Sequence, residues 1–364
     1  KDNSNNSLAN LNTDHFMGDG LYSWLKMDFG SMHYVNEMCL SPNKKDMERG
    51  SGKKVKSLYG FSNQGYVKFL KKDKSLDHEF IFGRSYIDHG FSKFNRILIS
   101  KWSRPFDQIA WKLKYKGITG KVVGVQLDPI MDNNRYLSLH TIDFNLVKNL
   151  TISFGESSLY AGENRGIELQ YFNPTLFWIP VRENQPKTNQ ANGFLYFGTK
   201  YSINKFSTWF EFLLDDYQID RNVPEPSTHG YTLGIELNNS TALLKNLYFE
   251  YSRIANRTYQ THGEHGQENY VHRNYPIGHY LGNDFESILM LIFFKNYNYS
   301  GLNNEPALKL SIINKGANNL NTPWDSPWDD ESNLQDGVYH ESFPTRPSKV
   351  LIESEFLVKF FVKV

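Results

Sequence analysis

The sequence predicts an all-β protein, a transmembrane antiparallel up-and-down β-barrel of about 16–18 strands with long polar loops. Three observations lead to this fold class. Many segments alternate apolar and polar side chains over roughly the 9–11 residues that a tilted strand needs to cross a bilayer. Aromatic residues make up 15% of the chain, which suits the aromatic girdles at the two lipid interfaces of a barrel. No apolar run approaches the roughly 18 residues of a membrane helix, since even residues 288–294 are followed by Lys295.

The alternation recurs along the chain. The first clear case sets Ile109, Trp111, Leu113 and Tyr115 against Ala110, Lys112, Lys114 and Lys116. A second sets Phe206, Thr208, Phe210, Phe212 and Leu214 against Lys205, Ser207, Trp209, Glu211 and Leu213. Further segments of this kind are residues 193–201, 231–237, 246–253, 287–294 and 307–313. Because successive side chains of a strand point to opposite faces, one face of each segment suits lipid and the other suits water.

The last predicted strand runs from about residue 347 to the end of the chain. We expect its apolar parity to face lipid, namely Phe356, Val358, Phe360 and Val362. We expect its charged parity to face inward, namely Glu355, Lys359 and Lys363. This strand is also expected to pair with the first strand, because closure of a barrel removes both sheet edges.

Composition agrees with a membrane barrel and argues against other classes. The mean hydropathy of −0.55 would suggest a soluble protein, but this average hides strands in which half of the residues face the lumen. A soluble sandwich also alternates, yet it would have to cover the Phe and Tyr ladders with a second sheet. The net charge of +1 gives no argument for nucleic acid binding. The single cysteine, Cys39, excludes an intramolecular disulfide.

The predicted organisation is a flexible N-terminal segment, residues 1–14, followed by one outer-membrane barrel domain, residues 15–364. The sequence begins at Lys1 without Met or a signal peptide, so we expect a processed form or a fragment. The longer polar connections are residues 41–56, 183–192, 221–230, 261–274 and 315–348. Long loops of such barrels face outside, whereas short turns face the periplasm.

Several short sequence motifs follow one another in order between about residue 80 and residue 284. They are Gly83-Arg84-Ser85-Tyr86 with Gly90-Phe91, then Trp102-Ser103-Arg104-Pro105-Phe106-Asp107, Gly155-Glu156-Ser157, Tyr171-Phe172-Asn173-Pro174, Asp216-Tyr217-Gln218-Ile219-Asp220 and Arg273-Asn274-Tyr275-Pro276-Ile277-Gly278-His279-Tyr280-Leu281-Gly282-Asn283-Asp284. In these motifs the chain resembles the Wzi family of capsule-assembly outer-membrane proteins, in the branch common in Bacteroidetes-like bacteria. The resemblance implies a barrel of about eighteen strands that helps to attach or assemble surface polysaccharide in the manner of a lectin, without bond chemistry. It also implies periplasmic helices that close the barrel.

The carboxylates near residue 216 raise the question of glycoside hydrolysis, which uses two carboxyl groups roughly 5–10 Å apart. Asp215 and Asp216 are neighbours on a strand and point to opposite faces, so they cannot form such a pair. Asp216, Gln218 and Asp220 share a face. A cluster of carboxylate and amide groups at the rim suits sugar hydroxyls, and it equally suits the start of a solvated loop.

Arg253, Arg257 and Tyr259 share one strand parity. Arginines inside a wide barrel usually pair with Asp or Glu, because a buried charge needs a partner. The same arginines could instead bind an acidic capsular sugar through bidentate hydrogen bonds. Both readings remain open.

The histidines of the loop around residue 265 do not predict a metal site. His262, Glu264, His265 and His272 lack the helical spacing of the His-Glu-x-x-His arrangement, and the glycines between them indicate an exposed loop.

Two further segments contain glycan-binding candidates. Residues 276–284 form a turn that feeds a strand, or they display His279 and Asp284 toward the lumen or a ligand. Trp324 and Trp328 lie among carboxylates in the longest loop, and aromatic faces beside carboxylates are a common way to bind sugars. The alternative for these tryptophans is an interfacial anchor, or a loop that folds back to plug the barrel.

We therefore expect a non-catalytic protein of the bacterial outer membrane that binds or anchors surface polysaccharide and assists capsule or exopolysaccharide assembly, with no cofactor. Its expected partners are capsular or exopolysaccharide, the lipid bilayer of the outer membrane and polysaccharide export machinery, and no nucleic acid. The first alternative is a general or substrate-selective diffusion porin, which would have an open, charged lumen. The second is an outer-membrane hydrolase, for which the sequence offers no catalytic pair.

Overall fold

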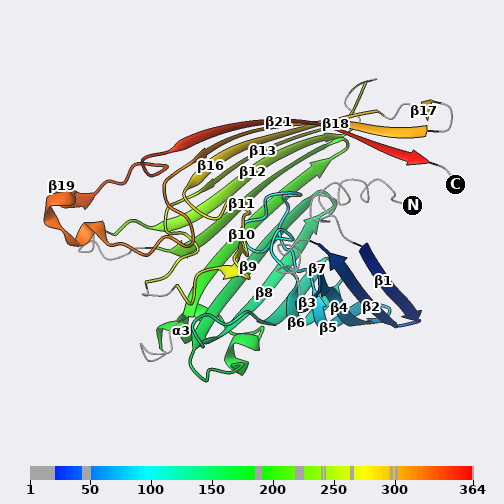
Figure 1. The fold of residues 1–364 in the computed structure, drawn as a ribbon, viewed down its shortest axis with the longest axis horizontal. Coiled ribbons are helices and arrows are strands. Elements are labelled where there is room, and N and C mark those ends of the chain that lie inside the picture. The colour runs from blue at the N-terminus through cyan, green and yellow to red at the C-terminus, as the bar shows by residue number, and fades with distance from the viewer. Residues whose placement is uncertain are drawn as a thin grey trace. The chain divides into compact units, whose positions relative to one another are not determined.

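The computed structural model describes residues 21–42, 51–184, 191–217, 225–238, 241, 243–262, 266–295, 298–299 and 302–362. Almost all of the regular structure in these ranges is antiparallel β-strand (Figure 1). Sixteen of the described strands have five residues or more, in agreement with the predicted number. The predicted all-β, up-and-down fold is confirmed. No helix in the described ranges is long and apolar enough to cross a membrane.

The chain forms two compact units, and three strands contribute residues to both. Unit 1 contains the described parts of Lys1–Phe144, Gly155–Gly193 and Gln267–Tyr280, and unit 2 those of Asn145–Phe154, Phe194–Gly266 and Leu281–Val364. The shared strands are β8 (Asn134–Val147), β9 (Leu150–Gly162) and β10 (Ala191–Ile203). The predicted division into residues 1–14 and 15–364 stays a prediction, since residues 1–20 lie outside the described ranges.

Unit 1 is built on consecutive antiparallel strands. They are β1 (Leu21–Phe29), β2 (Met32–Ser41), β3 (Ser51–Val55), β4 (Leu58–Lys72), β5 (Leu76–Ser85), β6 (Phe106–Tyr115) and β7 (Ile118–Gln126), with the short β14 (Val271–His272) and β15 (Tyr275–Pro276). The turns at residues 30–31, 73–75 and 116–117 are short, whereas the loop at 86–105 is long. The connection predicted at 41–56 is partly strand, because β3 pairs with the start of β4.

One face of unit 1 is aromatic and exposed, as the alternation predicts. Phe82 is 65% exposed and lies opposite Ile109 in the register of β5 and β6. On the same face the rings of Phe80 and Trp111 are stacked, with their centroids 5.8 Å apart, and His78 stacks against Trp111 at 6.3 Å. Exposed rings in a row on one face are the expected surface of a strand that faces lipid.

A buried arginine fixes one loop segment of unit 1. The Arg135 guanidinium donates hydrogen bonds to the backbone oxygens of Asn269 and Val271, both at 2.9 Å, and to that of Gln267 at 2.5 Å. Asp128 lies 3.6 Å from Arg135 and also accepts from the backbone N–H of Arg273 at 2.8 Å. Because a buried charge needs a partner, this arrangement holds residues 267–273 firmly against β8.

Unit 1 also contains the two helical turns η1 (Leu169–Phe172) and α3 (Trp178–Glu183). The buried Glu156 carboxylate accepts the backbone N–H groups of Trp178 at 2.9 Å and Ile179 at 2.8 Å, so it caps the start of α3. Tyr136, Tyr160, Tyr171 and Trp178 form the hydrophobic cluster beside it.

Unit 2 continues the antiparallel pairing. Its strands are β11 (Phe206–Asp216), β12 (Thr228–Asn238), β13 (Leu244–Ile254), β16 (Phe285–Phe294), β17 (Asn298–Tyr299), β18 (Leu302–Lys315) and β21 (Lys349–Val362), with the loop strands β19 (Leu334–Gln335) and β20 (Val338–Tyr339) and the 3-10 turns η3 (Pro327–Asp329) and η4 (Glu331–Asn333). The long strands lie side by side in chain order (Figure 1). Every strand that the alternation predicts in this part of the chain is present.

One face of the unit 2 strands is tightly packed. Trp209 is 3% exposed and lies opposite Gly234 in the register of β11 and β12. A Cβ atom on residue 234 would approach the Trp209 ring to 1.9 Å, so the indole requires glycine there. The Tyr196 hydroxyl donates to the buried Glu211 carboxylate at 2.8 Å, which satisfies a charge that would otherwise be costly.

The terminal strand β21 agrees with the predicted facing where its side chains are described. Phe356 and Val358 are exposed, 65% and 39% respectively. Glu355 points to the other face, where Lys309 Nζ lies 3.8 Å from its carboxylate. The side chains of Lys359, Phe360 and Val362, and the residues Lys363 and Val364, lie outside the described set. The predicted pairing of this strand with the first strand stays a prediction.

Candidate functional site

The longest loop of unit 2, residues 316–348, connects β18 to β21 and projects beyond the ends of the strands (Figure 1). Both ends of this loop are tied to one carboxylate. Asp284 is fully buried and accepts the backbone N–H groups of Thr345 at 2.9 Å and Asn318 at 3.1 Å, together with the Thr345 hydroxyl. A Cβ atom on Gly316 would lie 2.0 Å from Asp284 Oδ2, so glycine is needed where the loop begins.

A second set of contacts ties the loop to the segment that follows β13. The Gln260 amide donates to the backbone oxygens of Thr322 at 2.9 Å and Asn319 at 3.2 Å. The Gln260 oxygen accepts from the Asn283 amide at 2.9 Å, and Lys315 Nζ donates to the Asn283 carbonyl at 2.6 Å. Contacts to backbone oxygens fix the path of the loop whatever its side chains are.

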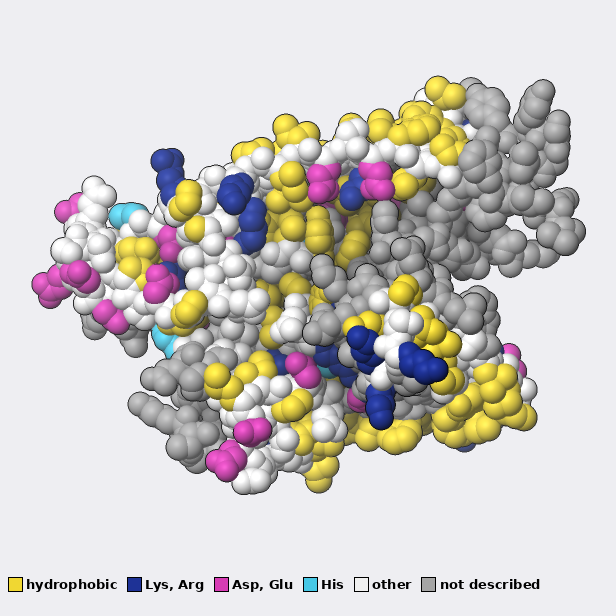
Figure 2. Space-filling view, in the orientation of Figure 1, with side chains coloured by type: hydrophobic (Ala, Val, Ile, Leu, Met, Phe, Trp, Pro, Cys, Tyr) yellow, Lys and Arg dark blue, Asp and Glu magenta, His cyan; other side chains and the backbone are white. Residues whose placement is uncertain are grey.

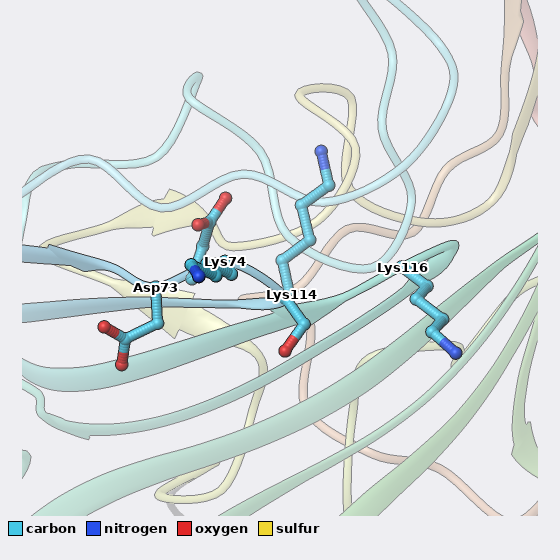
Figure 3. A pocket seen from close by; sticks show the side chains of 6 residues that line it. Asp73, Lys74, Lys114 and Lys116 are labelled. Carbon is cyan, nitrogen blue, oxygen red and sulfur yellow. The ribbon is translucent and has the colours of Figure 1, made fainter.

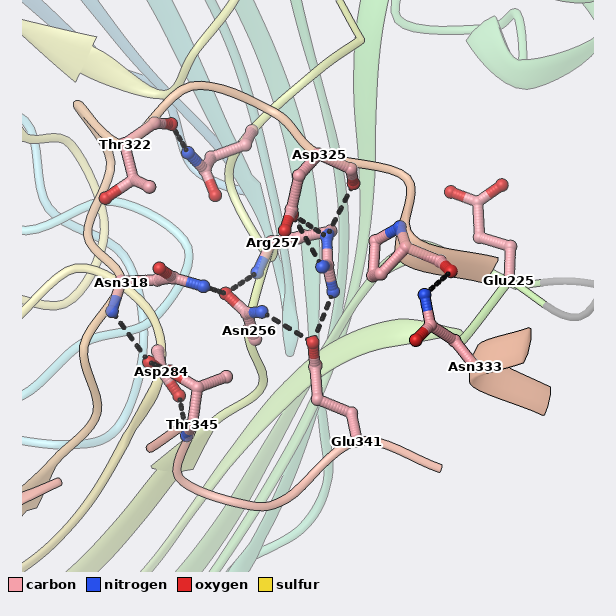
Figure 4. A network of polar contacts seen from close by, with 12 residues as sticks. Glu225, Asn256, Arg257, Asp284, Asn318, Thr322, Asp325, Asn333, Glu341 and Thr345 are labelled. Atoms are coloured by element: carbon pink, nitrogen blue, oxygen red, sulfur yellow. Dashed lines mark hydrogen bonds and ion pairs between the residues drawn. The ribbon is translucent and has the colours of Figure 1, made fainter. Parts of the chain in front are cut away.

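Arg257 lies at the centre of these contacts (Figure 4). Its guanidinium binds Asp325 Oδ1 at 2.6 Å through Nη2 and Glu341 Oε1 at 2.7 Å through Nη1. Asn256 donates to the same Glu341 oxygen at 2.9 Å. Burial alone would lower the pKa of Arg257, but the Glu341 and Asp325 carboxylates outweigh this and raise it. The arginine is therefore a fixed cation that joins two distant parts of the loop.

Aromatic rings surround this ion pair. The Arg257 guanidinium lies 4.8 Å from the centre of the Trp328 ring, and Tyr339 packs edge-on against Trp328 at 5.9 Å. Trp324 stands edge-on to Trp328 at 6.4 Å and packs against the His262 ring at 4.1 Å. Trp328 is buried, whereas Trp324 is half-buried and the His262 side chain is exposed. We call this group the loop cluster, defined as Arg257, His262, Trp324, Asp325, Trp328, Tyr339 and Glu341.

The loop cluster lies in acidic surroundings. Figure 2 shows Asp and Glu side chains gathered over the loop that carries β19. The exposed acidic residues of this loop include Asp329, Asp330, Glu331 and Asp336. Glu225 Oε1 lies 3.3 Å from His262 Nε2, and burial raises the pKa of this carboxyl group. Such a surface favours uncharged ligands that donate hydroxyl hydrogens over polyanions.

Three of the predicted glycan-binding residues meet in the loop cluster, namely Arg257, Trp324 and Trp328. Of the two readings of Arg257, the geometry favours an ion pair within the protein, because two carboxylates occupy its guanidinium. Its neighbour in the prediction, Arg253, lies over the Phe343 ring at 3.8 Å.

The other predicted residues lie elsewhere. Tyr259 is fully buried, and its backbone N–H donates to Asp215 Oδ2 at 2.6 Å. Asp216 is exposed at the end of β11, and its backbone N–H donates to the Thr228 hydroxyl at 3.0 Å. Asp284 is the buried carboxylate described above. Gln218 and Asp220 lie outside the described residues.

His279 belongs to unit 1 and is fully buried. Burial lowers its pKa to about 3, so the ring is neutral at physiological pH, and it stacks on Tyr280 at 4.9 Å. Within unit 1 the His279 side chain is therefore buried and is not displayed toward a ligand.

Sequence reasoning did not identify Glu341 or the role of Asp284. Glu341 is 84 residues from Arg257, and no local pattern connects the two. Within the described ranges no group of three or more His, Cys, Asp or Glu residues is arranged to hold a metal ion. Glu264 and His265, neighbours of His262 in sequence, lie outside these ranges.

The family of the chain follows from a match over most of its length. The family model described as capsule assembly protein Wzi matches residues 98–323. This chain belongs to the Wzi capsule assembly family. The resemblance to this family, predicted from the sequence motifs, is confirmed. The family and the fold also indicate the predicted location, the bacterial outer membrane.

Among the solved structures that resemble this chain, one agrees with the fold. Wzi of Escherichia coli, described as an outer membrane protein involved in group 1 capsule assembly and a carbohydrate-binding β-barrel, is 12% identical, with a TM-score of 0.61 over 84% of this chain and 67% of that one. OmpT of Vibrio cholerae is 9% identical, with a TM-score of 0.43 over 94% and 91% of the two chains. OccD3 of Pseudomonas aeruginosa is 10% identical, with a TM-score of 0.42 over 94% and 80%. No curated protein matches the chain.

Proposed function

We propose that this protein binds surface polysaccharide in the outer membrane through the loop cluster, and thereby assists capsule or exopolysaccharide assembly without bond chemistry. The observation that carries this proposal is the combination of a half-buried tryptophan with carboxylates in a loop whose backbone is fixed. Family membership and the carbohydrate-binding Wzi of Escherichia coli support it. Polysaccharide export machinery is the partner that we propose for the assembly step.

The loop cluster has the groups that a neutral sugar requires. Trp324 offers an indole face on which the C–H face of a pyranose can stack, and Asp325, whose side chain is 63% exposed, can accept hydroxyl hydrogens beside it. The Trp324 indole N–H is buried and has no hydrogen-bond acceptor among the described residues, so the indole offers its ring face to a sugar. Because the loop is already ordered, binding costs little conformational entropy.

Catalysis is not part of the proposal. A glycosidase needs two carboxyl groups that face the scissile bond. The two carboxylates of the loop cluster, Asp325 and Glu341, both bind Arg257 instead. Asp215, a further carboxylate that the sequence singles out, accepts the backbone N–H of Tyr259. We therefore assign the cluster a binding role only.

Trp324→Ala tests this proposal. We expect it to weaken binding of polysaccharide purified from the surface of the source bacterium by about tenfold or more, because the stacking surface is lost. Trp324→Phe should retain most of the affinity. Isothermal titration of the detergent-solubilised protein measures the effect.

The matched control for this test is Phe177→Ala, which removes a 78% exposed aromatic ring from a loop of unit 1. It should bind as the wild type does. Equal affinity of Trp324→Ala and the wild type would refute the assignment of the site to the loop cluster.

A further inference from the structure

The face of unit 1 opposite its exposed aromatic side chains carries a row of lysines near the short turns. Lys112 of β6 lies directly opposite Lys121 of β7 in the strand register. Lys114 lies one step nearer the turn, opposite Asp77 of β5, and Asp77 is also opposite Lys72 of β4. We call Lys72, Lys112, Lys114 and Lys121 the basic face.

The basic face contains a pairing that is unfavourable for the protein alone. Directly opposite side chains of an antiparallel pair have Cβ atoms roughly 4.5–5.5 Å apart, and like charges at such positions destabilise the sheet. Glu79, opposite Lys112 on the other side, binds Lys68 at 3.0 Å instead. Among the described residues no carboxylate lies within 4.0 Å of the ammonium groups of Lys112, Lys114 or Lys121. An anion bound between these lysines would remove the repulsion.

A cavity adjoins the basic face. It has a volume of about 310 Å³ and is lined by Asp73, Lys74, Ser75, Asp77, Lys114 and Lys116 (Figure 3). Lys74 and Lys116 come from the two turns at residues 73–75 and 116–117, and Lys114 comes from the end of β6. This volume lies at the lower end of the roughly 300–1,000 Å³ of small-ligand sites. The cavity is open and is thus large enough to hold one charged sugar unit of a polysaccharide chain.

An outer-membrane protein can bind two kinds of anion, phospholipid headgroups and acidic polysaccharides. The alternation of side chains along β6 distinguishes between them. Lys112 and Lys114 alternate with Ile109, Trp111 and Tyr115, which occupy the exposed apolar face. The basic face therefore does not point to lipid, and a phospholipid headgroup is not its ligand. A carboxylate or phosphate group on a polysaccharide fits the positive charge of the basic face and the repeat of lysines along it.

We propose that the basic face binds an acidic polysaccharide segment, with carboxylate or phosphate groups between Lys112 and Lys121 and beside Lys114. The inference rests on the proposed function, and it names a second site and a chemical class of ligand. Short turns of outer-membrane barrels face the periplasm. The basic face consequently meets the acidic chain at the periplasmic ends of these strands.

The test compares an acidic and a neutral chain, polygalacturonate and dextran of equal length, in the detergent-solubilised full-length protein. The wild type should bind polygalacturonate but not dextran at this site, and its affinity should fall as salt is raised from 50 to 300 mM, as expected for several lysines that contact a polyanion. The triple variant Lys112→Gln, Lys114→Gln, Lys121→Gln should lose at least tenfold in affinity. The control is Lys71→Gln, because Lys71 is exposed and opposite His78 on the other face. It should bind within twofold of the wild type.

Thermal unfolding provides a second readout that does not depend on affinity. Without ligand, the triple variant should melt at or above the temperature of the wild type, because the repulsion between Lys112 and Lys121 is gone. Polygalacturonate should raise the melting temperature of the wild type but not that of the triple variant. Equal stabilisation by inorganic phosphate at matched charge would overturn the inference, since it would show a small-anion site only.

The two proposals fail in different ways. If the wild type binds its own surface polysaccharide but the triple variant binds polygalacturonate with wild-type affinity, the inference about the basic face is wrong and the proposed function stands. If the wild type binds neither polysaccharide, both are wrong.

Discussion

Phe82→Arg is expected to destabilise the membrane-inserted protein by about 2–4 kcal/mol, because a lipid-facing arginine part-way across the bilayer must be desolvated. Phe82 is 65% exposed in the middle of β5, and its neighbours across the strand pair are apolar. Within the described register the one carboxylate on that face of β5 and β6 is Asp107, which already binds the Arg84 guanidinium, with Nε 2.8 Å from Oδ1. Folding titrations in urea with lipid vesicles would measure the loss, and gel mobility with and without heating would report the inserted fraction.

The control places the same side chain one residue away. Ile81→Arg puts an arginine on the opposite face of β5, next to Ala110 in the register, where water and polar groups can solvate it. We expect a much smaller loss of stability from this variant. Similar losses at residues 81 and 82 would contradict the facing that the alternation and the exposure both indicate.

Arg257→Gln is expected to release the loop of residues 316–348 and to weaken polysaccharide binding by tenfold or more. The change leaves the Asp325 and Glu341 carboxylates near each other without their common cation. Removal of one partner of a buried pair costs about 3–5 kcal/mol, and the exposure of Asp325 reduces this to roughly 2–3 kcal/mol here. Thermal unfolding would show the loss, and limited proteolysis should cut first within the loop.

The matched control is Arg346→Gln, which makes the same chemical change at an exposed arginine of the same loop. It should leave melting temperature, proteolysis and affinity near their wild-type values. An Arg257→Gln protein that resists proteolysis and binds polysaccharide normally would show that the ion pair does not organise the site.

Much of the fold could be predicted because the decisive information is local. In β6 the apolar and lysine residues alternate, and the structure places Ile109 on the exposed face. In β11 the prediction separates Phe210 from Trp209, and Trp209 is buried while Phe210 is not. Whether a side chain faces lipid or the protein interior depends on its parity, and parity can be read from the sequence. Residues 41–56 were predicted to be a loop because they are rich in Gly and Lys, so the short strand β3 was not predicted.

The candidate site could be predicted only in part. Trp324 and Trp328 were recognisable because they are tryptophans among carboxylates in a long loop. The roles of Asp284 and Glu341 were not, because they depend on contacts between residues 34 to 84 positions apart, which leave no periodic signal. His279 shows the same limit, since its complete burial follows from how its loop folds and not from its neighbours in sequence.

The most direct test of the central claim is a binding titration of the wild-type protein with polysaccharide purified from the surface of the source bacterium, followed by tryptophan fluorescence. The loop cluster contains Trp324 and Trp328, so binding there should change the emission and saturate. We expect saturable binding that Trp324→Ala weakens by about tenfold or more, together with little conductance in planar bilayers. No binding, accompanied by steady open-channel conductance, would contradict the account and indicate a diffusion porin.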